Sequence, residues 1–200
     1  MTILDFREIP QANLATGRQD DFELFSRDFL EYLGYLIISE PNRGQDGGID
    51  ILVEERRLGV GGQTNFSWLV SCKHYAHRDS GKGKAVGIDD EINIGDRVDS
   101  HGCDGFIGFY STIASSGLDN KLAKWSKQKN KEVQIFHHGK IEKYLFDRKK
   151  GIVIAKRYFP ISMQQWKEEP EREEIINNSL KGIRQEYYEE YIRRKNREKK

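Results

Sequence analysis

The chain has 200 residues, of which 36% are hydrophobic and 32% are charged, and its 33 basic residues nearly balance its 32 acidic ones. This balance excludes a uniformly basic protein that coats a polyanion. No apolar run is long enough to cross a membrane, no leader segment precedes the first elements, and two cysteines do not make a disulfide framework, so we expect a reduced, cytoplasmic protein with one main domain.

The first half of the chain alternates helical and strand patterns after an irregular lead-in over residues 1–19. Phenylalanines and leucines at helical spacing, with Asp20 or Asp21 as the cap and Gly34 as the stop, predict a helix over the intervening residues. Short apolar runs bounded by turn residues predict strands at 35–39, 49–53 and 66–75, with a loop over 41–48 and a hairpin connection over 56–65.

The second half continues the same alternation and then changes character. We expect helices at 88–99, 117–129 and 139–146, and strands at 105–110 and 133–137. Strands that alternate with helices are typical of an α/β domain, which we place at 20–150, followed by an extension over 151–200.

The extension itself contains two predicted elements. The apolar run at 151–159 reads as one more strand, and residues 171–192 carry an apolar stripe on an otherwise charged helix. That helix either packs on its own domain or binds a second copy of the chain or a partner protein.

Two charged residues lie where strand packing does not require them. Asp50 interrupts an apolar run, and Lys73 ends another. If the two strands are neighbours, a carboxylate and an ammonium meet at one edge of the sheet. A carboxylate can hold Mg²⁺, and a lysine beside it can orient the attacking water and stabilise charge on a phosphate, but a simple salt bridge satisfies the same pattern.

Further pattern lies around these two residues. The segments FELFSRDFLEYLGY (22–35), PNRGQDGGIDILV (41–53) and WLVSCKHYA (68–76) occur in the order and approximate spacing of the Mrr-type restriction endonuclease family, a branch of the PD-(D/E)xK nuclease superfamily. The resemblance extends over about residues 20–146 and is strongest over 22–76. It implies a restriction-endonuclease-like core, a central mixed sheet flanked by helices, here with a C-terminal helical extension. It also implies hydrolysis of DNA phosphodiester bonds with Mg²⁺, or Mn²⁺ as a substitute, in restriction or anti-phage defence.

The resemblance assigns roles position by position. Asp50 matches the metal-binding aspartate and Lys73 the catalytic lysine. Glu23 matches a glutamate that binds metal directly or through water, and the backbone carbonyl of Cys72 would be a further ligand.

The chain departs from the family at Ser71, where the family has a glutamate or glutamine. Three outcomes are open. In the first, Ser71 holds the metal of the catalytic site through a water while Glu23 supplies the missing negative charge. In the second, Asp46 approaches the metal instead. In the third, the site is catalytically weakened, which leaves a DNA-binding or assembly subunit.

Candidate nucleic-acid contacts follow the lysine and recur later in the chain. His74 and Tyr75 match the family pattern and either contact phosphate or buttress Lys73. Residues 121–167 carry 13 basic and 3 acidic side chains. Three of the basic residues, Lys121, Lys124 and Lys127, either hold DNA or form a solvated helix face.

Overall fold

The fold was analysed in a computed structural model, which describes residues 2–12, 20–39, 50–77, 84–167, 180–182 and 185. The chain divides into two compact units, one of Ile9–Ile141 and one of Met1–Glu8 with Glu142–Lys200. The predicted loop at 41–48 lies outside the described residues, and so does the predicted helix at 171–192 except at 180–182 and 185. All predicted site residues that are described belong to the first unit.

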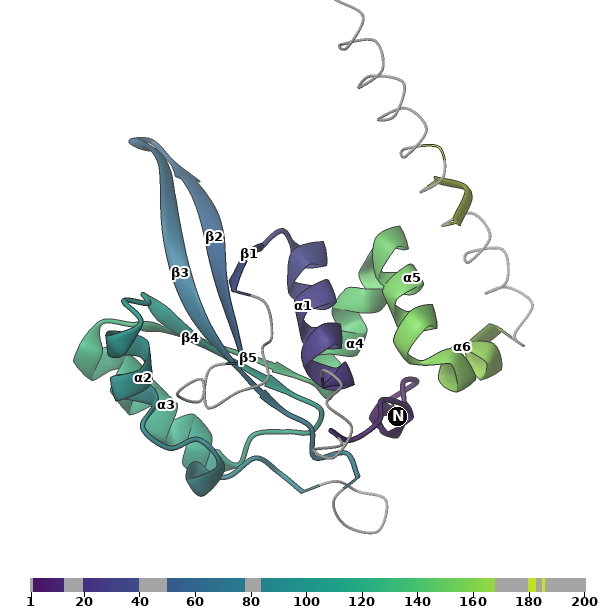
Figure 1. Ribbon diagram of the computed structural model, residues 1–200, viewed down its shortest axis with the longest axis horizontal. Helices are drawn as coiled ribbons and strands as arrows, with labels where there is room; N and C mark the ends of the chain where they lie inside the picture. The colour runs from purple at the N-terminus through teal and green to yellow at the C-terminus, as the bar shows by residue number, and fades with distance from the viewer. Residues whose placement is uncertain are drawn as a thin grey trace, which may run out of the picture. The chain divides into compact units, whose positions relative to one another are not determined.

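The first unit is built on one mixed sheet of five strands in the order β1-β2-β3-β4-β5 (Figure 1). The strands are β1 (Leu36–Ser39), β2 (Ile51–Gly59), β3 (Gly62–Lys73), β4 (Gly105–Tyr110) and β5 (Glu132–His137). The first three are antiparallel neighbours, whereas β4 runs parallel to β3 and β5 parallel to β4. The predicted central mixed sheet is therefore confirmed.

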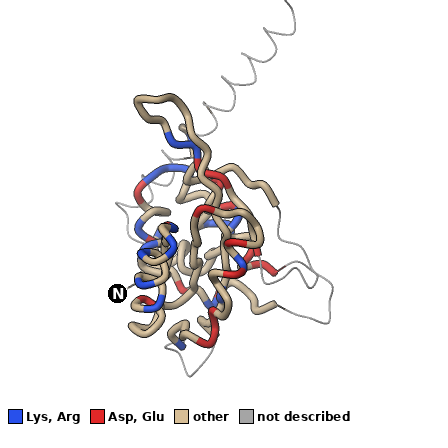
Figure 2. The backbone as a smooth tube through the Cα atoms, turned by 90° about the vertical axis from the view of Figure 1, so that its left-hand side faces the viewer, with Lys and Arg blue, Asp and Glu red and all other residues tan. Residues whose placement is uncertain are grey.

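The β2–β3 hairpin is longer than the sequence predicts. Residues 56–65 were expected to connect two strands, but they pair with one another until Gly59 faces Gly62. Gly62 has a φ of 109°, a left-handed conformation that lets the chain reverse over two residues. The Arg57 guanidinium lies 3.8 Å from the ring centroid of Phe66 and pairs with Glu132, which fixes the base of the extension. The tip beyond it carries no charge and is tan in Figure 2.

Helix α1 (Asp21–Leu33) packs its phenylalanines on one face of the sheet. The Asp20 carboxylate accepts a hydrogen bond from the amide of Phe22, and Gly34 ends the helix in the left-handed conformation, as predicted. The rings of Phe25 and Phe29 lie 5.7 and 5.5 Å from the ring of Phe109 on β4. This fully buried aromatic cluster anchors the first helix directly on the centre of the sheet.

The opposite face is covered by η2 (Ile88–Asp90), α2 (Ile94–Ser100) and α3 (Ser116–Lys129), which lie together on the side away from α1 (Figure 1). Their buried residues pack with Leu69, Phe106 and Tyr110 of the sheet. One continuous helix was predicted over 88–99, but Asn93 adopts a φ of 51°, which separates η2 from α2. The alternation of side chains along β3 and β4 thus gives the sheet two different cores.

Helix α4 (His138–Asp147) follows β5, and its last residues belong to the second unit with η1 (Phe6–Glu8), α5 (Lys149–Tyr158) and α6 (Pro160–Lys167). The predicted strand at 151–159 is wrong, because this segment forms α5. Its β-branched run suggested a strand, yet the buried residues Ile152, Ala155 and Phe159 recur at helical spacing. No helix among the described residues has the length and apolar content that crossing a membrane requires.

Candidate active site

Two backbone contacts fix Asp50 at the start of β2. Its amide donates to the carbonyl of Val70, at 3.3 Å, and its Oδ2 accepts from the amide of Cys72, at 2.5 Å. Because Ile51 faces Val70, the same register places Asp50 opposite Ser71. The predicted aspartate is therefore attached to β3, the strand that carries the predicted lysine.

Ser71 and Lys73 lie on the same face of β3 as Leu69, since side chains alternate along a strand. Leu69 belongs to the core beneath α2 and α3, so this face of the sheet end turns toward those helices. On β4, Gly108 pairs with Ser71, and Tyr110 pairs with Lys73. The structure thus brings Asp50, Ser71 and Lys73 together at one end of the sheet.

The groups around Asp50 shift the pKa of its carboxyl in opposite directions. Burial raises the pKa of the Asp50 carboxyl above its usual range, and the amide of Cys72 and the charges of Lys73 and Arg97 oppose this rise. The nearby carboxylate of Glu91 raises the Asp50 pKa further. A buried carboxylate with an acidic neighbour is suited to a bound cation, which would compensate both charges.

The residues present fit a divalent metal of the magnesium type. Within the described part of the chain, no hydrogen bond reaches Oδ1 of Asp50. Ser71 is fully buried, and its Oγ has no hydrogen-bond partner among the described residues. No group of three or more histidine, cysteine, aspartate or glutamate side chains gathers in a metal-binding arrangement over those residues. Mg²⁺ is commonly held by one or two carboxylates with water and substrate phosphate, so Asp50 beside an unpaired hydroxyl suits it.

Glu23 and Cys72 lie on the other side of β3. The thiol of Cys72 faces α1, and burial first, then the charges of Asp50 and Glu23, raise its pKa well above the usual value. A thiol with so high a pKa is a poor nucleophile. Cys72 reaches Asp50 through its amide, whereas the roles of its carbonyl and of Glu23 as metal ligands stay predictions.

The two residues after the lysine are held by the protein itself. The ring of His74 stacks on Phe22 with centroids 4.6 Å apart, its Nε2 lies 2.7 Å from the carbonyl of Ile9, and burial lowers its pKa. Tyr75 is buried, and its hydroxyl donates to Asp90 at 2.6 Å. These contacts bind both side chains to the protein itself, and the choice between a phosphate contact and support of Lys73 stays a prediction for both residues.

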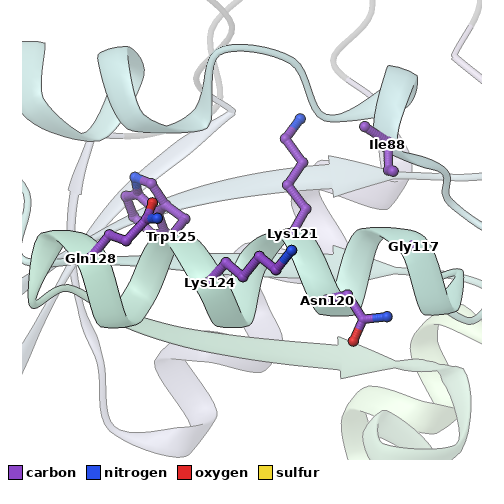
Figure 3. Close-up of a pocket in the computed structure, with 7 residues that line it drawn as sticks. All are labelled: Ile88, Gly117, Asn120, Lys121, Lys124, Trp125 and Gln128. Atoms are coloured by element: carbon purple, nitrogen blue, oxygen red, sulfur yellow. The ribbon is translucent and has the colours of Figure 1, made fainter.

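The three lysines of α3 differ in what they contact. The Nζ of Lys121 donates to the backbone carbonyl of Glu91, at 3.1 Å. Lys121 and Lys124 line a pocket along α3 together with Trp125, and Figure 3 shows them projecting from the same helix. The side chains of Lys124 and Lys127 are exposed, so both are accessible to a polyanion.

Three residues that the sequence did not single out lie beside the site. Glu91 is fully buried, its Oε1 accepts from the hydroxyl of Tyr110 at 3.1 Å, and its Oε2 accepts from Arg97 at 3.2 Å. The available signal was the acidic run at 89–91 with an arginine six residues after Glu91, but such runs usually lie in solvent. Only the fold reveals that the last member of the run is buried against β4.

Comparison with known proteins identifies the class of this domain. Residues 14–107 match the family model Mrr_cat, described as a restriction endonuclease. The match includes Asp50, Ser71, Lys73 and Glu91, and it confirms the resemblance that the sequence suggested. Residues 14–107 are therefore similar to the catalytic domain of the Mrr-type restriction endonuclease family.

Two solved structures are similar to parts of this chain. The DNA modification-dependent restriction endonuclease AspBHI is 15% identical over 72% of this chain and 33% of its own, with a TM-score of 0.46. The MspJI restriction endonuclease, solved in complex with a 27-mer oligonucleotide, is 15% identical over 70% of this chain and 32% of its own, with a TM-score of 0.40. The chain thus spans about a third of the length of each. No curated protein sequence matches it.

Proposed function

We propose that this protein is a metal-dependent endonuclease that hydrolyses phosphodiester bonds of DNA. The observation that carries the proposal is the juxtaposition of Asp50 and Lys73 at one sheet end, within a region that matches a restriction endonuclease family. Mg²⁺ is the expected cofactor, with Mn²⁺ as a substitute.

Each site residue has a role that follows from its chemistry. Asp50 and the hydroxyl of Ser71 would hold the metal, which lowers the pKa of a bound water and polarises the phosphoryl oxygen. The Lys73 ammonium would orient the attacking water and offset the charge that develops on the phosphate. The Cys72 amide keeps the Asp50 carboxylate aimed at this position.

The first experiment is cleavage of plasmid DNA by the purified protein with Mg²⁺ or Mn²⁺. We expect Lys73→Ala to reduce cleavage by at least about a hundredfold, because general acid–base groups typically contribute this much. Lys143→Ala removes an exposed lysine from α4 and is the matched control, expected to cut like the wild type. Equal cleavage by the wild type and Lys73→Ala would show that a different site, or a contaminant, does the chemistry.

The same preparation separates a nuclease from a DNA-binding subunit. If the wild type binds DNA in a salt-dependent way but does not cut it with any metal, the protein is a DNA-binding subunit whose catalytic site is weakened by the serine at position 71. Cutting that requires Lys73 would exclude it.

A role in restriction or anti-phage defence follows from the family alone. Cells that carry the wild-type protein should plate phage less efficiently than cells that carry Lys73→Ala at equal protein level. Equal plating would leave the nuclease without this biological role.

A further inference from the structure

The sheet face beside Asp50 is made of two very small residues. Ser71 on β3 and Gly108 on β4 are direct neighbours in the parallel ladder. A Cβ placed on Gly108 would lie 2.4 Å from both Cζ and the hydroxyl oxygen of Tyr110. The phenol of Tyr110 therefore folds back over Gly108, and its hydroxyl lies next to the Ser71 position.

The same hydroxyl leads to a carboxylate. It donates to Oε1 of Glu91 at 3.1 Å, so the Glu91 carboxylate lies within one hydrogen bond of the space over Ser71 and Gly108. A longer side chain at position 71 would extend into this space. Glu91 thus brings a carboxylate, from a different element, to the region where the family pattern puts one on β3.

Glu91 is also unusual in its burial and charge. Its side chain is fully buried and is paired with Arg97 at 3.2 Å, and the electrostatic effect of both residues reaches Asp50. Burial of an ion pair costs free energy and adds little net stability, which makes a purely structural purpose a weak reason for it. Each carboxylate oxygen accepts one hydrogen bond here and has a further lone pair available.

We propose that Glu91 is the second carboxylate of the metal site and takes the place of the glutamate or glutamine that the family has at position 71. The proposal rests on the proposed function and adds one residue to its site. Asp50 and Glu91 then supply the two negative charges, Ser71 supplies a neutral oxygen, and Tyr110 and Arg97 hold Glu91 in position.

The test measures metal binding without DNA or turnover. Mn²⁺ is titrated into the purified protein, and the free ion is followed by electron paramagnetic resonance. We expect Glu91→Gln, which keeps the size of the side chain, to weaken Mn²⁺ binding at least about tenfold, as loss of a ligand or of its orienting partner does. Asp99→Asn on α2, whose carboxylate pairs at the surface with Lys129 and Lys131, is the matched control and should bind like the wild type.

The outcomes separate this inference from the proposed function. If Asp50→Asn abolishes Mn²⁺ binding and the folded Glu91→Gln variant binds Mn²⁺ like the wild type, Glu91 has only a structural role and the inference is wrong. If neither Asp50→Asn nor Glu91→Gln changes binding, the metal site itself is misplaced and the proposed function fails with it.

A rescue variant tests whether positions 71 and 91 are equivalent. Glu91→Ala removes the carboxylate that accepts from the Tyr110 hydroxyl, and Ser71→Glu in that background returns a carboxylate to this region from β3. We expect the double variant to bind Mn²⁺ at least about tenfold more tightly than Glu91→Ala, because the charge returns to the same place. A folded double variant, verified by circular dichroism, that binds no better than Glu91→Ala would overturn the equivalence.

Discussion

The groups around Asp50 do not fully compensate the charge of its carboxylate. Its carboxylate is buried next to Glu91, and the Cys72 amide, Lys73 and Arg97 offset this only in part, so its pKa stays raised. A charged group that the protein alone does not fully compensate is a typical property of a ligand-binding site. Its hydrogen bond to β3 keeps it in place nonetheless.

The raised pKa of Asp50 predicts how stability depends on pH in the metal-free protein. Between the usual pKa of an aspartate and the raised pKa of Asp50, the folded protein keeps a proton that the unfolded chain has released. The free energy of unfolding therefore falls as the pH rises through this window, and above it the buried charge is destabilising.

Asp50→Asn should accordingly be more stable than the wild type at neutral pH in the presence of a chelator, although we expect it to be inactive. The difference should vanish at a pH below the usual aspartate pKa, where both side chains are neutral. Urea unfolding at several pH values measures it. A variant that is less stable at neutral pH would show that the carboxylate is well compensated as it stands.

Gly108 is a second residue with a definite expected effect. An added Cβ would lie 2.4 Å from the Tyr110 ring, which is buried, and 2.8 Å from Cδ1 of Ile135, which is half-buried. Gly108→Ala should therefore displace Tyr110 and destabilise the protein by about 1–3 kcal/mol, the usual cost of overpacking.

The control for this change is Gly61→Ala in the hairpin turn, where nothing lies within 4 Å of the added Cβ. Thermal unfolding compares the two variants with the wild type. A Gly108→Ala protein as stable as Gly61→Ala would mean that Tyr110 moves aside without cost and does not hold its neighbours firmly.

Among the described elements, α3 carries two exposed lysines that we expect to contact a DNA backbone. Lys124 and Lys127 are exposed, and each phosphate contact releases about one counterion from DNA. Replacing both lysines by alanine should weaken binding to all DNA sequences alike and reduce the slope of log affinity against log salt by about 2.

Fluorescence anisotropy over a range of salt concentrations gives this slope. Lys143→Ala on α4 controls for the loss of one exposed charge elsewhere. An unchanged slope in the double variant would indicate that this face of α3 is only solvated.

Elements whose pattern is local could be predicted from the sequence, and elements shaped by distant contacts could not. Helix α1 carries its own cap, stop and apolar spacing, and β4 is a short, fully apolar run. By contrast, α5 contains a β-branched run, and its first turn packs so closely on α4 that a Cβ on Gly151 would lie 2.3 Å from the carbonyl oxygen of Leu145. The length of the hairpin likewise depends on Arg57, which binds Glu132 from another strand.

For the molecule as a whole, some residues of the candidate site could be predicted from local sequence patterns, and others are brought to it only by the fold. Asp50 and Lys73 could be predicted because strand neighbours bring together residues with a recognisable motif. Glu91 could not, because it lies 18 residues beyond Lys73 in an acidic run and reaches the site only when η2 and α2 fold against β4. The near-neutral total charge is the sum of two halves of opposite sign, with a net charge of −7 over residues 1–100 and +8 over residues 101–200.

The unbroken pairing of β2 with β3 has a consequence for how this protein can change over time. Every pair from Gly59 with Gly62 to Ile51 with Val70 is in register, and this register decides which residue faces Asp50. One residue inserted into β3 would turn Ser71 and Lys73 toward the other face of the sheet, and one inserted into β2 would do the same to Asp50. Substitutions at the uncharged tip are therefore easily tolerated, whereas insertions and deletions in the strands are not, and we expect the hairpin to vary in composition but not in length.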